Sequence, residues 1–386
     1  MASACVLSAH RLLLVAVPWV VLTSTGSATE TGLVTLCQIV PFVVMQTLTG
    51  PLVDRVSARR VGALGDLVSS GAIAVLAAVG TPPPWLIMAV MAVVGTADGP
   101  SAAAKAVLVP VVTGAARQPL ERGTGLVAAV ERSATGIGPM LAGLLIVDVG
   151  GARTLWLVAA LFGIGSLVGV ATLTGRPAVR RRSGYLQQLR QGAAFLRTDT
   201  SLRALVVMFT VTNFLDQALL VVLLPVWARA GGHGATFVGA AISVFGGAAA
   251  VTALLAAWIG HRLPRRATYL TVFVVSGVVR FVALAVDLPP AAVLVVFTVA
   301  GFGSGLVNPI VAAVQYERTP QRLRGRVQAL ITAWAWAGIP FGGLAGAGLL
   351  AAAGPSGALW LCGIGYLAAV IYPGWRVTWA SPPVGL

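Results

Sequence analysis

Residues 50–60 read GPLVDRVSARR, a short charged turn between two apolar runs at 32–49 and 61–80. Neither run would stay soluble as an isolated helix, and the turn between them holds one acid and three arginines. A tight basic turn between two such runs is typical of a short cytoplasmic loop between membrane helices. The segment therefore predicts a membrane protein that crosses the bilayer several times.

Composition supports this prediction. The chain is 58% hydrophobic and only 10% charged, whereas a soluble domain carries about 25% charged residues. Its 386 residues suffice for about twelve spans of about 20 residues each, so we expect an all-α polytopic protein. The expected spans are about 4–24, 32–52, 61–80, 85–108, 123–147, 152–173, 203–228, 236–259, 267–287, 290–315, 326–350 and 356–376.

The net charge of +15 does not predict nucleic-acid binding, because the positive residues fall between apolar runs. Most of the 26 lysines and arginines lie in every second connection, which predicts a multi-pass protein of the bacterial cytoplasmic membrane with both termini cytoplasmic. Cys5, Cys37 and Cys362 lie in apolar stretches without paired or metal-ligand spacing, so we expect free thiols and no metal.

The longest polar stretch, 174–202, divides the chain. We predict a first six-helix bundle at 1–173, a basic cytoplasmic linker with an amphipathic helix at 174–202, and a second bundle at 203–386. The halves echo each other, since 122–143 and 324–343 share a spaced pattern of arginine, glycine and proline. The first apolar run begins almost at Met1 and places His10 and Arg11 in mid-span. We therefore predict either that the first helix is short at its inner end or that the given sequence starts later than the true first residue.

The first turn resembles the loop signature of the major facilitator superfamily, G-x-x-x-D-R-x-G-R-[RK], with one extra residue before the double arginine. The matching residues are Gly50, Asp54, Arg55, Arg59 and Arg60. Residues 25–33, together with 308–309 and 317–327, resemble members of the macrolide-efflux and enterobactin-exporter type. This resemblance implies two parallel six-helix repeats with substrate bound between them.

The resemblance also implies a cytoplasmic charge network that gates the transporter. Asp54 is expected near the start of the eleventh helix, where the macrodipole favours a carboxylate. The gating candidates are Gly50, Asp54, Arg55, Arg59, Arg60, Glu121, Arg122, Glu317, Arg324 and Arg326. His261 stands in the second turn where relatives often keep an acid, which weakens the corresponding network there.

The fifth span resembles the antiporter pattern G-x8-G-x3-G-P-x2-G-G, with alanine at 134 and 142. Small residues permit close helix contact and proline permits a bend. The bend candidates are Gly138, Pro139, Gly143 and, in the second half, Pro340. The pattern favours export, while a tight helix contact alone is the alternative.

Charges inside spans are the candidates for proton or substrate binding, because an ionisable group in a membrane is costly unless it is paired or hydrated. These candidates are Glu131, Arg132, Asp216, Asn213, Asp98, Lys105 and Arg280. The alternative for each is a structural ion pair. The shallower Asp66 is expected to be structural.

These observations predict a secondary transporter that exports an amphipathic or hydrophobic small molecule, such as a drug, siderophore or secondary metabolite, in exchange for protons. The chain has no G-x-x-x-x-G-K-[ST] loop, so we expect no cofactor and a proton gradient as the driving force. We expect no enzyme activity, and as partners a small-molecule substrate and the lipid bilayer, with the protein monomeric. Metabolite uptake, facilitated diffusion and a non-transporting membrane sensor stay as alternatives.

Overall fold

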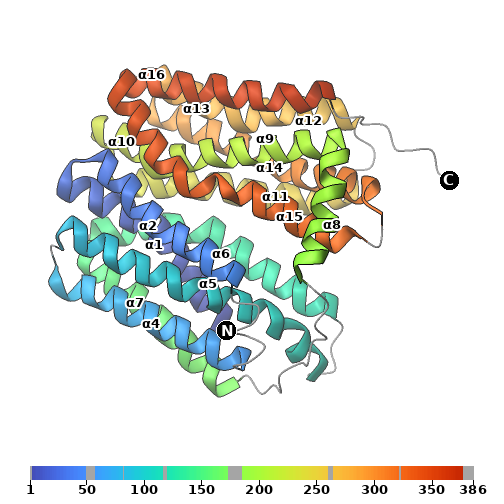
Figure 1. Cartoon of the computed structure of the whole chain (residues 1–386). Helices are drawn as coiled ribbons and strands as arrows, with labels where there is room; N and C mark the ends of the chain where they lie inside the picture. The colour runs from blue at the N-terminus through green and yellow to red at the C-terminus, as the bar shows by residue number, and fades with distance from the viewer. Residues whose placement is uncertain are drawn as a thin grey trace. The chain divides into compact units, whose positions relative to one another are not determined.

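The structure is a computed structural model that describes residues 2–48, 57–80, 82–115, 120–172, 185–259, 264–320 and 323–376. Every regular element in these ranges is helical (Figure 1). The helices are α1 (Ala2–Thr25), α2 (Ala28–Leu48), α4 (Ala58–Val79), α5 (Pro84–Ala115), α6 (Leu120–Asp148), α7 (Gly151–Thr172), α8 (Tyr185–Thr198), α9 (Thr200–Ala218), α10 (Leu224–Ala230), α11 (Ala235–Ile259), α12 (Arg265–Phe273), α13 (Val279–Ala285), α14 (Pro290–Arg318), α15 (Arg324–Ala337) and α16 (Ile339–Arg376). Two π-helical turns, η1 (Leu219–Leu223) and η3 (Val274–Val278), join α9 to α10 and α12 to α13.

The helices are long and apolar enough to cross a membrane. Within the described residues, 10 stretches meet that criterion, and Ser133–Asp148 in α6 is a shorter apolar helix. The longest stretch, Leu330–Gly374, contains two of the predicted spans. With Leu330–Gly374 counted as two spans and Ser133–Asp148 as one, the helices account for the twelve predicted spans. The all-α polytopic fold is confirmed.

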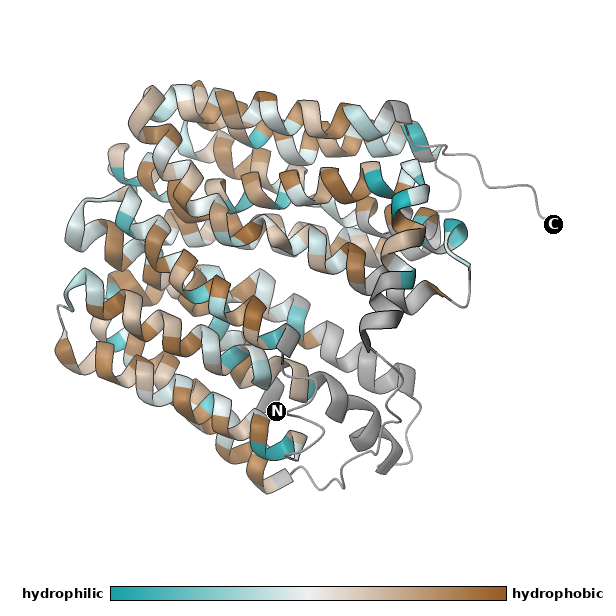
Figure 2. Ribbon diagram, viewed as in Figure 1, coloured by the Kyte–Doolittle hydropathy of each residue, from teal (hydrophilic) through white to brown (hydrophobic). Residues whose placement is uncertain are grey.

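Hydrophobic residues recur along the helices (Figure 2), and many large apolar side chains are exposed. Leu167 is 69% exposed, Val295 62% and Ile364 61%. Side chains of this size gain nothing from contact with water, whereas lipid tails accept them without penalty, and helices satisfy their own backbone polar groups. The surface is therefore suited to a bilayer.

The helices form two compact units by their contacts. Unit 1 comprises Met1–Arg180 together with Pro225–Ser243, and unit 2 comprises Arg181–Leu224 together with Val244–Leu386. The predicted division at 173 and 203 stays a prediction, and the contact units differ from it mainly in grouping residues 225–243 with unit 1.

Each unit repeats the same pattern of helix pairs. In unit 1, α1 packs on α6 and α7, α2 packs on α5, and α4 packs on α5 and α7. In unit 2, α9 packs on α15 and α16, α12 packs on α14, and α13 packs on α16. The first predicted span of each half thus lies against the fifth: α1 packs on α6 in unit 1, and α9 packs on α15 and α16 in unit 2. The similar sequence patterns of the two halves predict this correspondence.

Paired glycines bring two helices of each unit into backbone contact. A Cβ at Gly95 or Gly99 of α5 would clash with a carbonyl of α2, that of Gln38 or Phe42. In unit 2, a Cβ at Gly301 or Gly305 of α14 would meet the carbonyls of Phe245 and Ala249 in α11. Glycines four residues apart lie on one face of a helix, so each pair permits close approach along a full turn.

The Gly-Pro segment of α6 lies between two neighbours. A Cβ at Gly138 would come within 2.5 Å of the Arg11 Cβ of α1, and one at Gly143 within 2.5 Å of the Ala235 carbonyl oxygen in α11. Pro139 has no N–H to donate to the preceding turn, and the N–H of the next residue, Met140, donates to Ser243 Oγ at 2.7 Å. These small residues make α6 a contact helix within unit 1.

The last two predicted spans are less regular than expected. The predicted span 326–350 is interrupted at Gly338, between α15 and α16, and Pro340 lies in the first turn of α16. A second break lies inside α16, where Gly354 has φ 71° and ψ 176°. Only glycine adopts that backbone conformation without strain, so the two spans are separated at this residue.

The amphipathic helix predicted in the linker is α8. Its Leu196 is buried in a cluster with Leu202 and Val206 of α9 and with Val327 and Ile331 of α15. Figure 1 shows α8 alongside α15. This end of its apolar face packs inside unit 2.

Candidate functional site

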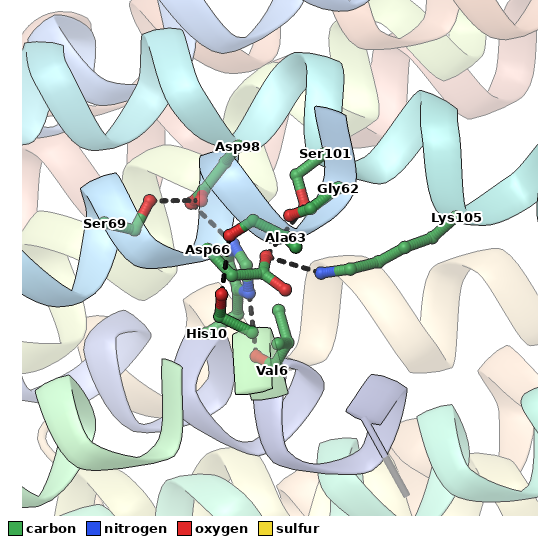
Figure 3. A network of polar contacts seen from close by, with 10 residues as sticks. Val6, His10, Gly62, Ala63, Asp66, Ser69, Asp98, Ser101 and Lys105 are labelled. Atoms are coloured by element: carbon green, nitrogen blue, oxygen red, sulfur yellow. Dashed lines mark hydrogen bonds and ion pairs between the residues drawn. The ribbon is translucent and has the colours of Figure 1, made fainter. Parts of the chain in front are cut away.

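A buried polar network connects α1, α4 and α5 of unit 1 (Figure 3). His10 Nε2 lies 2.7 Å from Asp98 Oδ2, and His10 Nδ1 lies 2.8 Å from the Val6 carbonyl oxygen. The second carboxylate oxygen of Asp98 accepts a hydrogen bond from Ser69 Oγ at 2.6 Å. Asp98 is only 3% exposed, so its carboxylate is held by protein groups on both oxygens.

A second pair lies one to two turns along α5. Lys105 Nζ donates to Asp66 Oδ1 at 2.6 Å, and Ser101 Oγ donates to the same oxygen at 2.7 Å. Asp66 is 1% exposed. The structural role expected for Asp66 therefore has a physical basis, and Lys105 is held by an acid from α4.

The spacing on α5 explains why both pairs face α4. Asp98, Ser101 and Lys105 are three, four and seven residues apart, which places them on one face of a helix. Asp98 and Lys105 share that face, as the sequence indicates, yet they do not pair with each other: each takes a partner from another helix.

The predicted acid of the fifth span, Glu131, lies near the same helix α1. Its Oε1 is 3.9 Å from Arg11 Nη2, and its side chain is 56% exposed. The contact is long and partly open, so it contributes little stability. The side chain of Arg132 lies outside the described residues.

Among the described residues of unit 2, a buried arginine pairs with a partly exposed acid. Arg280 of α13 is 2% exposed, and its Nη2 donates to Asp216 Oδ1 of α9 at 2.6 Å. The guanidinium carbon lies 4.7 Å from the centre of the Phe245 ring in α11, a favourable cation–π distance. The acid that the sequence left unidentified for Arg280 is therefore Asp216.

Two π-helical turns lie next to this pair. The turn η1 begins three residues after Asp216, and η3 ends two residues before Arg280. A π turn adds a residue to the helix and redirects the side chains that follow, and such turns are frequent at functional sites. The two charged residues thus belong to the least regular parts of their helices.

Polar side chains also bind α9 to the end of α15. Asn213 Nδ2 donates to the Ala335 carbonyl oxygen at 2.9 Å, and Thr210 Oγ1 lies 2.9 Å from the Trp334 carbonyl oxygen. Those carbonyls lie in the last turn of α15, which ends at Ala337 and whose final carbonyls lack helical partners. Asn213 is therefore committed to a backbone carbonyl and belongs to helix packing in unit 2.

Most gating candidates fall outside the described residues. Gly50, Asp54 and Arg55 lie there entirely, as do the side chains of Glu121, Arg122, Arg324 and Arg326. Arg59 is half-buried and Arg60 exposed at the start of α4, and Glu317 is exposed near the end of α14. Their gating role stays a prediction.

An ion pair that the sequence did not single out lies beside Glu317. Arg318 Nη1 donates to Asp199 Oδ2 at 3.2 Å. The other carboxylate oxygen of Asp199 accepts from the Leu202 N–H at 2.9 Å and so caps α9. The pair ties the end of α14 to the start of α9 within unit 2.

Sequence reasoning missed His10 as a partner, together with Ser69, Ser101 and Phe245. The signal for His10 was present, because a histidine in mid-span needs a polar neighbour. The spacing 98–101–105 on α5 was a second signal. Among the described residues, no three histidine, cysteine or acidic side chains are grouped as a metal site requires.

Chemically, the two units hold different groups. Unit 1 holds a histidine and two carboxylates that can exchange protons, while unit 2 holds one such carboxylate, Asp216, beside a guanidinium that stays charged at any physiological pH. Both sets lie inside helices that are apolar along most of their length (Figure 2). Ionisable groups at such positions are a common feature of substrate and ion pathways.

Comparisons with known proteins agree with these observations. The family model of the Major Facilitator Superfamily matches residues 1–212 and 206–385. The chain is 31% identical over 353 residues to the multidrug efflux pump Tap of Mycobacterium tuberculosis (strain ATCC 25618 / H37Rv), covering 88% of this chain and 83% of that protein. It is 30% identical over 356 residues to the Tap pump of Mycolicibacterium fortuitum, covering 89% and 86%.

Solved structures of transporters share the fold. The nucleoside transporter NupG superposes with a TM-score of 0.77 at 14% identity, covering 97% of this chain and 96% of its own. A transporter of the POT family in complex with 5-aminolevulinic acid gives a TM-score of 0.74 at 10% identity, covering 96% of this chain and 93% of its own. As the first turn indicated, the chain belongs to the Major Facilitator Superfamily, and it is a multi-pass membrane transporter rather than an enzyme.

Proposed function

We propose that this transporter exports lipophilic or amphipathic small molecules from a bacterial cell by proton antiport. The observation that carries the proposal is the identity of 31% to a multidrug efflux pump over 88% of the chain. The protein would lie in the cytoplasmic membrane as a monomer, with both termini in the cytoplasm and with substrate access alternating between the two sides.

The lining expected for the cargo site supports a lipophilic substrate. The facing helices of the two halves would contribute mainly aliphatic and aromatic residues, such as Phe214, Trp334 and Trp336, and few polar groups. Trp334 is 57% exposed and Trp336 42% exposed. Because the two residues lie two positions apart on one helix, they point to different sides, and at most one of them lines the same cavity wall. Apolar pockets with a few oriented polar groups suit drug-sized ligands better than sugars, which need many hydrogen-bond partners.

Ionisable groups within the helices support proton coupling as the energy source. Asp98 and Asp216 lie within spans, and Glu131 lies within α6. Burial in a medium of low dielectric favours the uncharged form of a carboxylate, so such a group can take up a proton on one side and release it once water returns. Because the sequence has no nucleotide-binding loop, an ion gradient is the expected driving force.

Transport in everted membrane vesicles tests the proposal. We expect ethidium, a lipophilic cation, and Nile red, a neutral lipophilic dye, to accumulate inside vesicles whose interior is acidified. Collapse of the pH gradient with nigericin should abolish this accumulation, and vesicles without the protein give the background.

Three outcomes would contradict the proposal in different ways. Movement of sucrose but of neither dye would contradict the lipophilic substrate. Accumulation that continues after nigericin would contradict proton coupling. Dye uptake into intact cells, with none into everted vesicles, would reverse the direction of transport.

A further inference from the structure

The contact between His10 and Asp98 in unit 1 contains a proton that its geometry allows us to count. His10 Nδ1 lies 2.8 Å from a backbone carbonyl oxygen, which only accepts, so Nδ1 carries a hydrogen. His10 Nε2 lies 2.7 Å from Asp98 Oδ2. An unprotonated ring nitrogen and a carboxylate oxygen are both acceptors, so a proton must lie between them. The pair therefore holds one proton more than a neutral imidazole and a free carboxylate.

Loss of that proton would break the contact. Two lone pairs would face each other at 2.7 Å, and the site would carry a net negative charge in apolar surroundings, which is costly. Asp98 would keep its bond from Ser69 on α4, at 2.6 Å. His10 is therefore the partner that moves, and the contact between α1 and α5 depends on whether the proton is present.

The two partners differ in their access to the outside of unit 1. The His10 side chain is 34% exposed, whereas Asp98 is 3% exposed. On its covered side, the imidazole meets the Phe162 ring of α7 edge to face, with ring centres 5.0 Å apart. A proton can reach the pair through the open edge of His10, while the apolar ring and the helices exclude water from Asp98.

The surrounding charges leave His10 as the group that exchanges a proton near neutral pH. Beside it on α1 lies Arg11, which stays charged, with Glu131 of α6 next to Arg11. Toward α4 and α5, Lys105 is bound to Asp66, and the ordinary pKa of lysine is about 10.4. From α7 the contact is the Phe162 ring. Histidine alone in this set has an ordinary pKa of about 6.5.

We propose that the His10–Asp98 pair binds and releases the coupling proton in unit 1, with His10 as the exchanging group and Ser69 as the residue that positions Asp98. This inference rests on the proton antiport proposed above and assigns it to a specific pair. Proton release would separate α1 from α5, and that separation would link proton movement to the shape of the first bundle.

The proton itself can be observed without any transport measurement. The full chain, labelled with 15N-histidine and placed in lipid nanodiscs, contains 3 histidines, and the variant His10→Gln identifies the His10 signals. We expect His10 to carry hydrogen on Nδ1 and to exchange one proton between about pH 5 and pH 9. In Asp98→Asn the midpoint should move by at least about one pH unit, while Asp148→Asn, at the exposed end of α6, should leave it unchanged. A His10 signal that does not titrate, or that titrates identically in Asp98→Asn, would overturn the proposal.

Transport separates a coupling role from a structural one. Glutamine at position 10 can still donate to Asp98 but exchanges no proton. We expect His10→Gln to reduce gradient-driven ethidium accumulation at least about tenfold, which corresponds to the loss of a required step, and to leave ethidium exchange without a gradient within about twofold. His233→Gln is the matched control, since His233 packs against Trp227 and Phe237, away from the network.

The outcomes are distinct. Equal loss of driven transport and exchange would show a structural role and overturn the proposal, as would driven transport at the wild-type rate. A wild-type protein that moves neither dye would contradict the proposed function and with it the coupling role. The histidine titration would then still decide whether the pair binds a proton.

Discussion

The two units place a polar residue of their first helix against a charge on another helix, but the charges behave differently. In unit 1, His10 of α1 shares a proton with Asp98 of α5 at 2.7 Å. In unit 2, Asp216 of α9 binds Arg280 of α13 at 2.6 Å. A histidine exchanges its proton near neutral pH and an arginine does not. The contact in unit 1 can thus lose its cation when the histidine releases a proton, whereas the arginine in unit 2 is a permanent charge and only its carboxylate partner can change charge.

Burial differs between the two pairs in which partner is enclosed. In unit 2 the guanidinium of Arg280 is 2% exposed and stacks on Phe245, while Asp216 is 30% exposed. In unit 1 the carboxylate of Asp98 is 3% exposed, while His10 is 34% exposed. A charge in an apolar interior must be paired to be stable, and a group that exchanges protons needs access to water. The enclosed partner is therefore the permanent cation in unit 2 and the carboxylate in unit 1.

The largest loss of stability is expected from breaking the permanent pair. Arg280→Leu removes the buried guanidinium and leaves Asp216, which is 30% exposed, without its partner, which costs up to about 3–5 kcal/mol. The thermal midpoint in detergent should fall sharply, and Arg280→Leu/Asp216→Leu should recover most of the loss because both charges are then gone. Arg153→Leu, at the exposed start of α7, is the control. A midpoint for Arg280→Leu equal to that of Arg153→Leu would show that the pair does not hold unit 2 together.

A smaller loss is expected from the lysine pair of unit 1. Lys105→Met leaves Asp66 with the hydrogen bond from Ser101 alone, and Asp66 is 1% exposed. Partial satisfaction should limit the cost to about 2–3 kcal/mol. The same thermal measurement checks this value, and Lys105→Met/Asp66→Leu should be more stable than Lys105→Met. The opposite order would mean that Asp66 is solvated rather than paired.

Removal of the positioning residue should have a moderate effect on stability and a specific effect on pH dependence. Ser69→Ala removes one hydrogen bond to Asp98 and should cost about 1 kcal/mol. Without this hydrogen bond, Asp98 can move together with His10 when the proton leaves. We therefore expect driven export to depend less steeply on pH than in the wild type. Rates of dye accumulation from pH 6 to pH 8 measure that dependence, with Ser166→Ala, a serine bonded to the Ala63 carbonyl, as control. An unchanged profile would remove Ser69 from the coupling site.

The smallest effect on stability is expected at Glu131. Its side chain is 56% exposed and its contact with Arg11 is 3.9 Å long, so Glu131→Gln should change the free energy of unfolding by less than about 1 kcal/mol. If Glu131, which lies beside Arg11, delivers protons to His10, driven export should slow in this variant while dye exchange persists. Chemical unfolding and vesicle transport on one preparation compare the two effects. A large loss of stability would mean that Glu131 is a structural partner after all.

The course of the chain could be predicted from the sequence because apolar length determines which segments cross a bilayer. The charged turn at 50–60, the arginine-rich connections and the repeated pattern at 122 and 324 were sufficient for the family and the helical class. Breaks within helices were harder. Gly338 and Gly354 interrupt the last spans, and glycine is too frequent in membrane helices to mark a break by itself.

The partners of the buried charges could not be predicted in the same way. Asp216 and Arg280 are 64 residues apart, and His10 and Asp98 are 88 apart. A sequence indicates roughly how deep a charge lies along its helix, but not the direction in which it points toward other helices. His10 was placed in mid-span without a partner, and Arg280 without an acid, because only helix packing brings these residues together.

The paired glycines of α5 and α14 bear on how the cargo range of such a protein can change during evolution. At each of these positions the nearest facing atom on α2 or α11 is a backbone carbonyl oxygen, such as that of Gln38 or Phe245. Every amino acid supplies the same carbonyl, so the facing helices can replace their side chains without disturbing the contact. The glycines themselves cannot vary. The constraint therefore falls on one helix of each pair, and its partner is free to acquire new residues for new compounds.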